Sequence, residues 1–82
     1  MVELMPNNII YQVVIYKGPK DYPHDYVARR WNIVPGGLDP TDEIFVAKKI
    51  VDVRSWVKEN YPGLCQMDPF SDDDPCIHEV WI

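Results

Sequence analysis

The stretch IIYQVVIYK, residues 9–17, decides the fold of this 82-residue chain. It is rich in β-branched and aromatic side chains, which suit the pleated surface of a strand. Alternation divides its apolar residues between two faces, with Ile9, Tyr11, Val13 and Ile15 on one and Ile10, Val14 and Tyr16 on the other. A strand that is apolar on both faces usually lies centrally in a sheet or has one face covered by a helix. The stretch therefore predicts a central strand.

A second strand is predicted at YVARRWNIV, residues 26–34, after a loop at residues 18–25. Gly18, Pro19 and Pro23 interrupt regular structure in that loop. Alternation places two sets of side chains on opposite faces of the second strand: Val27, Arg29, Trp31 and Ile33 on one, and Tyr26, Ala28, Arg30, Asn32 and Val34 on the other. A loop of about eight residues is compatible with an antiparallel hairpin.

The stretch from residue 43 to residue 63 has two interpretations. Apolar residues recur in it at helical spacing: Val46, Ile50, Val53, Val57 and Tyr61. One long helix could therefore begin after Thr41, a suitable N-cap that is followed by two acidic residues. The cluster EIFVA is instead typical of a strand. We predict a turn-rich connection over PGGLDPTDE, a short strand at 43–47 and a helix at about 50–60 that ends at Pro62 and Gly63.

Two short strands are predicted at residues 64–67 and 76–82, joined by the loop MDPFSDDDPC. The whole order is strand, strand, short strand, helix, strand, strand, which indicates an α+β domain. We expect residues 1–82 to form a single small domain, with an antiparallel sheet of four or five strands and one helix packed on one face. Trp31, Trp56 and Trp81 are expected to add buried area to the core between the two layers.

The net charge of −5 is distributed unevenly along the chain. Residues 1–35 carry four basic and three acidic side chains, whereas residues 36–82 carry four basic and ten acidic ones. An acidic domain repels phosphate at long range, so nucleic-acid binding is disfavoured. A basic protein partner is favoured over nucleic acid, although an acidic surface also serves solubility alone.

The N-terminal residues show no basic start and no apolar run of signal-peptide length. No segment approaches the roughly 20 apolar residues that span a membrane. We therefore expect a cytoplasmic protein that does not associate with membranes. In a reducing compartment, the two cysteines Cys65 and Cys76 are more typical of small core residues than of a disulfide.

Two patterns were considered as metal sites. Asp72, Asp73 and Asp74 are consecutive, whereas a calcium-binding loop spaces its acids at alternate positions around a glycine. The pattern C-x10-C-x-H of Cys65, Cys76 and His78 lacks the close ligand pairs and the fourth ligand of a structural zinc site. The acidic stretch is interpreted as a turn, and neither a metal nor a cofactor is expected.

Catalysis has one candidate pair in the sequence. Cys76 and His78 are two residues apart, so they would share one face of the last strand. No nucleophile elbow and no glycine-rich phosphate loop accompany them. We therefore expect a protein that is not an enzyme.

The segment DYPHDYVARRW, residues 21–31, is the best positive indication of binding. Aromatic residues beside arginine are typical of proteins that bind single-stranded nucleic acid. The alternative is a core strand whose arginines pair with the surplus carboxylates. The candidate partner-binding residues are Tyr22, Tyr26, Arg29 and Arg30 from this segment and Asp72, Asp73 and Asp74 from the acidic loop.

The function expected from these patterns is that of a small acidic binding or regulatory protein, which acts through protein–protein contacts and not as an enzyme. Accessory proteins of phages and mobile elements are often of this kind. Two alternatives remain, a small single-stranded nucleic-acid-binding protein and a Cys/His-based enzyme or metal protein. A homodimer is compatible with all three, because a C-terminal strand at a sheet edge could pair with its copy.

Overall fold

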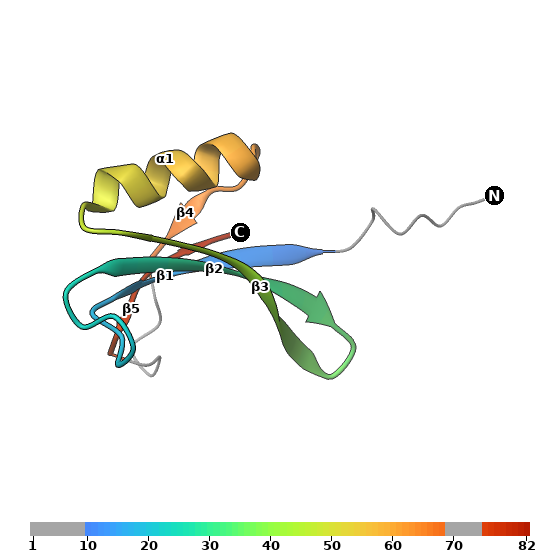
Figure 1. Cartoon of the computed structure of the whole chain (residues 1–82). Helices are drawn as coiled ribbons and strands as arrows, with labels where there is room; N and C mark the ends of the chain where they lie inside the picture. The colour runs from blue at the N-terminus through green and yellow to red at the C-terminus, as the bar shows by residue number, and fades with distance from the viewer. Residues whose placement is uncertain (1–9, 69–74) are drawn as a thin grey trace.

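A computed structural model describes residues 10–68 and 75–82 of the chain. Five strands of these residues form one antiparallel sheet in the order β3-β2-β1-β5-β4, and helix α1 lies across one face of it (Figure 1). The elements span Tyr11–Lys17 (β1), Tyr26–Val34 (β2), Gly37–Ala47 (β3), Ile50–Asn60 (α1), Gln66–Met67 (β4) and Ile77–Trp81 (β5). The α+β prediction is confirmed.

Strand β1 occupies the middle of the sheet, between β2 and β5, as its apolar pattern predicts. Val13 and Ile15 face the helix and are completely buried. Val14, on the opposite face, is only 4% exposed because β2 and β5 flank it on both sides. Burying each such side chain stabilises the fold by roughly 1.5–3 kcal/mol.

The core lies between α1 and the sheet. The predicted helical stripe supplies Val53 and Val57, both completely inaccessible to solvent, and Tyr61 follows them after the last turn. The helix ends where it was predicted to end, because Pro62 cannot continue it and Gly63 adopts a φ of 96°. Within the described residues no helix is long and apolar enough to cross a membrane.

A chain of aromatic rings runs between the two layers. Tyr11 contacts Tyr61, Tyr61 contacts Trp56, and Trp56 stacks on Phe45, each at a centroid distance of 5.4 Å. Trp81 is also buried in the core. The expectation that Trp31 would join this core is wrong, because its pairing in register with Gln12 and Pro40 places it on the face away from α1.

Strand β3 is much longer than the predicted strand at 43–47. It begins at Gly37, directly after a two-residue turn in which Gly36 has a φ of 91°. Pro40 is tolerated inside it because β3 is an edge strand, where a missing N–H costs no ladder hydrogen bond. Residues 37–42, predicted to be a turn-rich connection, are therefore strand.

A bulge bends β3 where the alternative interpretation placed a helix start. The register shifts between Arg29 and Trp31 of β2, so that β3 carries extra residues at this point. The Thr41 hydroxyl donates to the Arg30 carbonyl at 2.7 Å and accepts from the Glu43 N–H at 3.2 Å. Thr41 thus holds the bulge and does not cap a helix.

The two edges of the sheet are β3 and β4. Strand β5 lies between β1 and β4, so the expectation that the C-terminal strand would offer a free edge to a second copy is wrong. A two-residue strand on one edge, and a proline with a bulge on the other, are features that discourage pairing between molecules.

One ion pair joins the helix to the sheet, with a buried Glu79 carboxylate and an Arg54 side chain that is 37% exposed. The Glu79 side chain on β5 is 4% exposed, and Arg54 of α1 donates its Nε–H to both carboxylate oxygens, at 2.9 and 3.2 Å. Trp81 Nε1 donates to the same carboxylate at 3.1 Å. Burial alone would raise the pKa of Glu79, but the hydrogen bonds from Arg54 and Trp81 outweigh it and hold this pKa below its ordinary value.

A second polar cluster closes the end of the core where the helix ends. The Arg30 guanidinium lies 4.2 Å from the ring centre of Tyr11 and 5.7 Å from that of Tyr61. Arg30 also pairs with Glu43 at 3.6 Å, and the Tyr61 hydroxyl donates to the same carboxylate. Burial, with the neighbouring Glu43 carboxylate, raises the pKa of Tyr61 to about 12.

This shift predicts a loss of stability in alkaline solution. The folded state favours neutral Tyr61, so its contribution is complete below the unfolded pKa of 10.0 and disappears as the pH rises through about 12. We expect urea unfolding to lose on the order of 2 kcal/mol from this group across that interval. Tyr61→Phe should lose clearly less stability than the wild type between pH 10 and pH 12. Equal losses would contradict the assignment of this effect to the ionisation of Tyr61.

Candidate functional site

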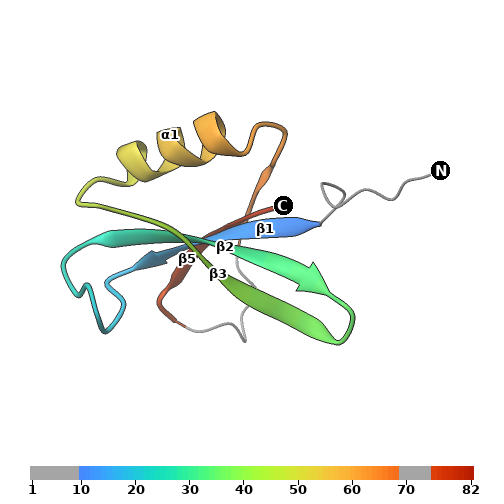
Figure 2. The same ribbon diagram turned by 45° about the vertical axis from the view of Figure 1, so that its right-hand side comes forward.

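The sheet has one covered face and one open face. Helix α1 covers the first, and no helix or strand of the described residues lies over the second (Figures 1 and 2). Residues paired in register share a face, and the open face defined in this way holds Gln12, Val14, Tyr16, Val27, Arg29, Trp31, Ile33, Leu38, Pro40, Ile44, Val46, Met67 and Val80. Ile33, Leu38 and Ile44 are 38%, 49% and 38% exposed. The sheet thus presents an apolar surface to solvent.

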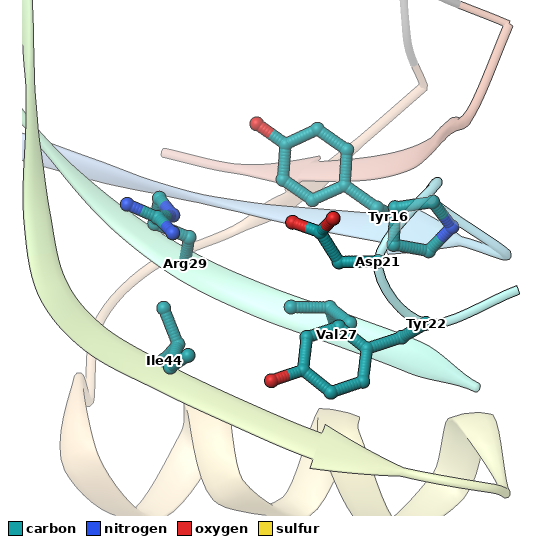
Figure 3. Close-up of a pocket in the computed structure, with 7 residues that line it drawn as sticks. Tyr16, Asp21, Tyr22, Val27, Arg29 and Ile44 are labelled. Carbon is teal, nitrogen blue, oxygen red and sulfur yellow. The ribbon is translucent and has the colours of Figure 1, made fainter.

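A hollow of about 170 Å³ lies on this open face, between the sheet and the loop that joins β1 to β2. Figure 3 shows Tyr16 and Tyr22 on two sides of Val27, with Arg29 at the end away from the loop. The residues that line the hollow are Tyr16, Pro19, Asp21, Tyr22, Val27, Arg29 and Ile44. We refer to it as the Arg29 hollow.

The two neighbouring arginines have different surroundings. Arg30 faces the helix layer and pairs with Glu43, as the expected pairing with surplus carboxylates requires. Arg29 is half-buried on the open face, and its Nη1 donates to the carbonyl oxygen of Thr41 at 3.0 Å. Among residues 10–68 and 75–82, no carboxylate forms an ion pair with Arg29. Within the described residues, the predicted pairing is therefore found for Arg30 and not for Arg29.

The loop wall of the hollow is shaped by backbone hydrogen bonds. Gly18 N–H donates to the Asp25 carbonyl at 2.9 Å and closes the base of the loop. Within it, the Tyr22 N–H donates to the Pro19 carbonyl at 2.9 Å, which folds Tyr22 back toward the sheet. Gly18 has a φ of 62°, and a Cβ added there would lie 3.0 Å from the Pro23 carbonyl oxygen.

Gly18→Ala should therefore disturb the loop. The left-handed backbone and the close carbonyl together predict a loss of about 1–2 kcal/mol in the free energy of unfolding. Amide resonances of Asp21 and Tyr22 should shift strongly in a ¹H–¹⁵N spectrum. Gly36→Ala serves as a control, because its φ is also positive but a Cβ there meets nothing within 4 Å. Unchanged loop resonances in Gly18→Ala would contradict this description.

The structure brings together some of the predicted partner-binding residues and separates others. Tyr22 and Arg29 both line the Arg29 hollow. Arg30 and Tyr26 lie on the helix side, where Tyr26 packs against the core and its ring meets His78 edge-on at 5.6 Å. The acidic candidates Asp72, Asp73 and Asp74 lie outside the described residues.

Five residues of the hollow were absent from the predicted set: Tyr16, Pro19, Asp21, Val27 and Ile44. Alternation placed Tyr16 and Val27 on the faces that now line the hollow. The pairing of β2 with β3, which places Ile44 beside Arg29, could not be predicted from the sequence. The signal was therefore present in the strand pattern and needed the strand order to be interpreted.

The cysteines and His78 do not form one cluster. The Cys65 backbone pairs with Ile82, whereas the Cys76 carbonyl accepts from Lys17 N–H at 2.7 Å at the opposite end of β5. Six residues of strand separate these points by roughly 20 Å, too far for two ligands of one zinc ion. Cys65 is also exposed, so its prediction as a core residue is wrong, while Cys76 is half-buried.

Across the described part of the chain, no three metal-ligating side chains gather at one point. The His78 ring lies against Tyr26, and its Nε2 is 3.7 Å from the Glu79 carboxylate. That carboxylate also accepts hydrogen bonds from Arg54 and Trp81. The arrangement around His78 is therefore part of the ion-pair network between helix and sheet.

Comparison with models of protein families, with curated proteins and with solved structures found no match to this chain. We therefore infer the function from the geometry of the open face and of the Arg29 hollow.

Proposed function

We propose that this chain is a small non-enzymatic interaction module that binds a partner protein through the open face of its sheet. The observation that carries the proposal is the exposure of Ile33, Leu38 and Ile44 on the face away from α1, the same face that holds the Arg29 hollow. Contiguous exposed apolar surface on a small domain is typical of a contact surface. Arginine and tyrosine are enriched at the centres of protein interfaces.

The size of the hollow favours a protein over a small-molecule substrate. At about 170 Å³ it is smaller than the roughly 300–1,000 Å³ of pockets that enclose a drug-sized ligand. It accommodates one anchoring side chain, and Ile44, which lines it, is 38% exposed and offers further apolar contact. Such a combination of anchor pocket and surrounding surface is the usual form of a protein–protein interface.

We also propose a cytoplasmic, regulatory or accessory role for this module, of the kind that phages and mobile elements often encode. The exposed thiol of Cys65 supports a reducing compartment. The blunt edges of the sheet favour contact through its face over addition of a strand.

Capture from an extract of the source organism tests the proposal, with three immobilised proteins compared. Wild type and Val51→Glu, which alters an exposed side chain on the helix, should retain the same partner. Ile44→Glu should lose it, because the variant replaces an apolar wall of the hollow by a carboxylate beside Arg29. A partner retained equally by all three proteins, or lost with Val51→Glu alone, would overturn the open face as the contact surface.

Single-stranded nucleic acid is a second candidate, favoured by one observation. Tyr16, Tyr22 and Arg29 surround one hollow, and Trp31 shares their face, so bases could stack there. The net charge of −5 opposes this candidate. Gel shifts with labelled single-stranded DNA and RNA at low salt separate the two functions, since binding that Arg29→Gln abolishes would support nucleic acid.

A further inference from the structure

We propose that the Arg29 hollow recognises one particular anchor in a partner protein, a large apolar side chain flanked by a carboxylate. The apolar group would enter between Val27 and Ile44, and the carboxylate would accept hydrogen bonds from Arg29. The inference rests on the proposed function, because it names the chemistry of the same face. It concerns one anchor residue, and the partner surface around that anchor can be basic.

The state of Arg29 is the first argument. A guanidinium has five N–H donors in a planar fork, and the hydrogen bond to the Thr41 carbonyl uses Nη1. That bond orients the fork without neutralising its charge. The protein carries 13 acidic side chains, yet none of the described ones pairs with Arg29. Since none of the described carboxylates lies within ion-pair distance of this half-buried cation, an incoming carboxylate can bind the fork in bidentate fashion.

The shape of the hollow is the second argument. Val27 and Ile44 line the hollow together with Arg29, and most of the exposed carbon surface of the two belongs to Ile44, at 38% exposure against 6% for Val27. A cavity of about 150 Å³ is large enough for a benzene-sized group, and this hollow measures about 170 Å³. A leucine or phenylalanine side chain therefore fits beside the cation, with its neighbouring carboxylate directed to Arg29.

The Asp21 carboxylate allows us to predict in which direction a variant changes the affinity for an acidic anchor. Asp21 lines the same hollow from the loop, and its carboxylate points across the hollow toward the side on which Arg29 lies (Figure 3). An incoming carboxylate would be repelled by this charge while it is attracted by Arg29. Asp21 thus selects against loosely placed anions, and removing its charge should strengthen the binding of an acidic anchor.

The test uses N-acetyl-leucine, which has an apolar side chain beside a carboxylate, and N-acetyl-leucinamide, which lacks the charge. Both are titrated into the ¹⁵N-labelled full chain and followed by ¹H–¹⁵N spectra. The acid should shift resonances of Tyr16, Val27 and Ile44 and bind about fivefold to tenfold more tightly than the amide. Equal binding of acid and amide, or no shift at the hollow, would overturn the proposal.

Four variants sharpen the result. Arg29→Gln should remove the preference for the acid, and Arg29→Lys should retain only part of it, because lysine keeps the charge and loses the fork. Asp21→Asn should tighten binding of the acid about twofold to fivefold. Lys20→Gln, an exposed loop residue that does not line the hollow, is the matched control and should behave like wild type. A dispersed spectrum confirms that each variant is folded.

The outcomes also separate this inference from the proposed function. If Ile44→Glu loses the captured partner while acid and amide bind equally, the open face remains the contact surface and the carboxylate anchor is wrong. If the acid is preferred but Ile44→Glu and wild type capture the same proteins, the hollow is a site for small carboxylic acids. In that case the interaction module, and the protein anchor with it, are wrong.

Discussion

Arg54→Ala is expected to lower the free energy of unfolding by about 3 kcal/mol near neutral pH. The variant leaves the Glu79 carboxylate, whose side chain is 4% exposed, without its guanidinium partner. The Trp81 N–H would still donate to it, and His78 Nε2 would lie 3.7 Å away. A buried charge that loses its partner costs far more than the pair contributes in comparison with apolar replacements.

The pH dependence identifies the cause of that loss. In the wild type the pKa of Glu79 lies below its ordinary value of 4.5, so its contribution is present above that pH and is lost as the pH falls through the folded pKa. Without Arg54, burial raises the pKa of Glu79, and protonation then relieves the buried charge. The difference between variant and wild type should therefore shrink as the pH falls from about 7 to about 4.

Urea unfolding at several pH values measures this difference. Lys48→Ala is a suitable control, because it breaks the Lys48–Asp25 pair, whose lysine side chain is 80% exposed. An exposed pair of this kind contributes roughly 0–1 kcal/mol. A loss in Arg54→Ala no larger than in Lys48→Ala, or one that is constant with pH, would contradict the assigned burial of Glu79.

Ile15→Ala is expected to lose about 3–4 kcal/mol. Ile15 is completely buried beneath α1 and is among the largest fully buried side chains, so its truncation leaves a cavity between the layers. Ile44→Ala removes the same atoms from the open face, where the side chain is already 38% exposed, and should lose less than about 1 kcal/mol. The contrast measures which face of the sheet is the core.

Chemical unfolding of the two variants provides the comparison, with circular dichroism spectra to show that both retain their secondary structure. Similar losses for Ile15→Ala and Ile44→Ala would mean that something covers the open face in the isolated chain. The division of the sheet into a stabilising face and a binding face would then be incorrect.

Local sequence patterns were sufficient to predict the bounds of the elements in which all the patterns indicate the same structure. Strand β2 and helix α1 have the predicted bounds, because alternation, the helical stripe and the Pro62–Gly63 stop each act within a few residues. Strand β3 was only partly predicted, since Pro40 and the acidic residues beside it are unfavourable in an inner strand. Proline and acidic residues are tolerated at the edge of a sheet. The position of β3 at the edge depends on the strand order, which local sequence patterns do not show.

The candidate site depended even more on strand order. The opposite orientation of Arg29 and Arg30 follows from alternation alone and is confirmed. The sequence of β2 does not show which of its two faces the helix covers. The covered face decides whether Arg29 or Arg30 lies on the core side of the sheet. Ile44 joined the site only through its register with Arg29. Trp31 was assigned to the wrong layer for the same reason.

Photo-crosslinking in cells tests the binding role of the open face most directly. A photoreactive amino acid is introduced in place of Ile44 in the Arg29 hollow and, separately, in place of the exposed Val51 on the helix. Because the contact is proposed to involve the sheet face, irradiation should join a discrete partner protein to the chain modified at position 44 and not at position 51. Adducts formed at position 51 alone, or equally at both positions, would contradict the account.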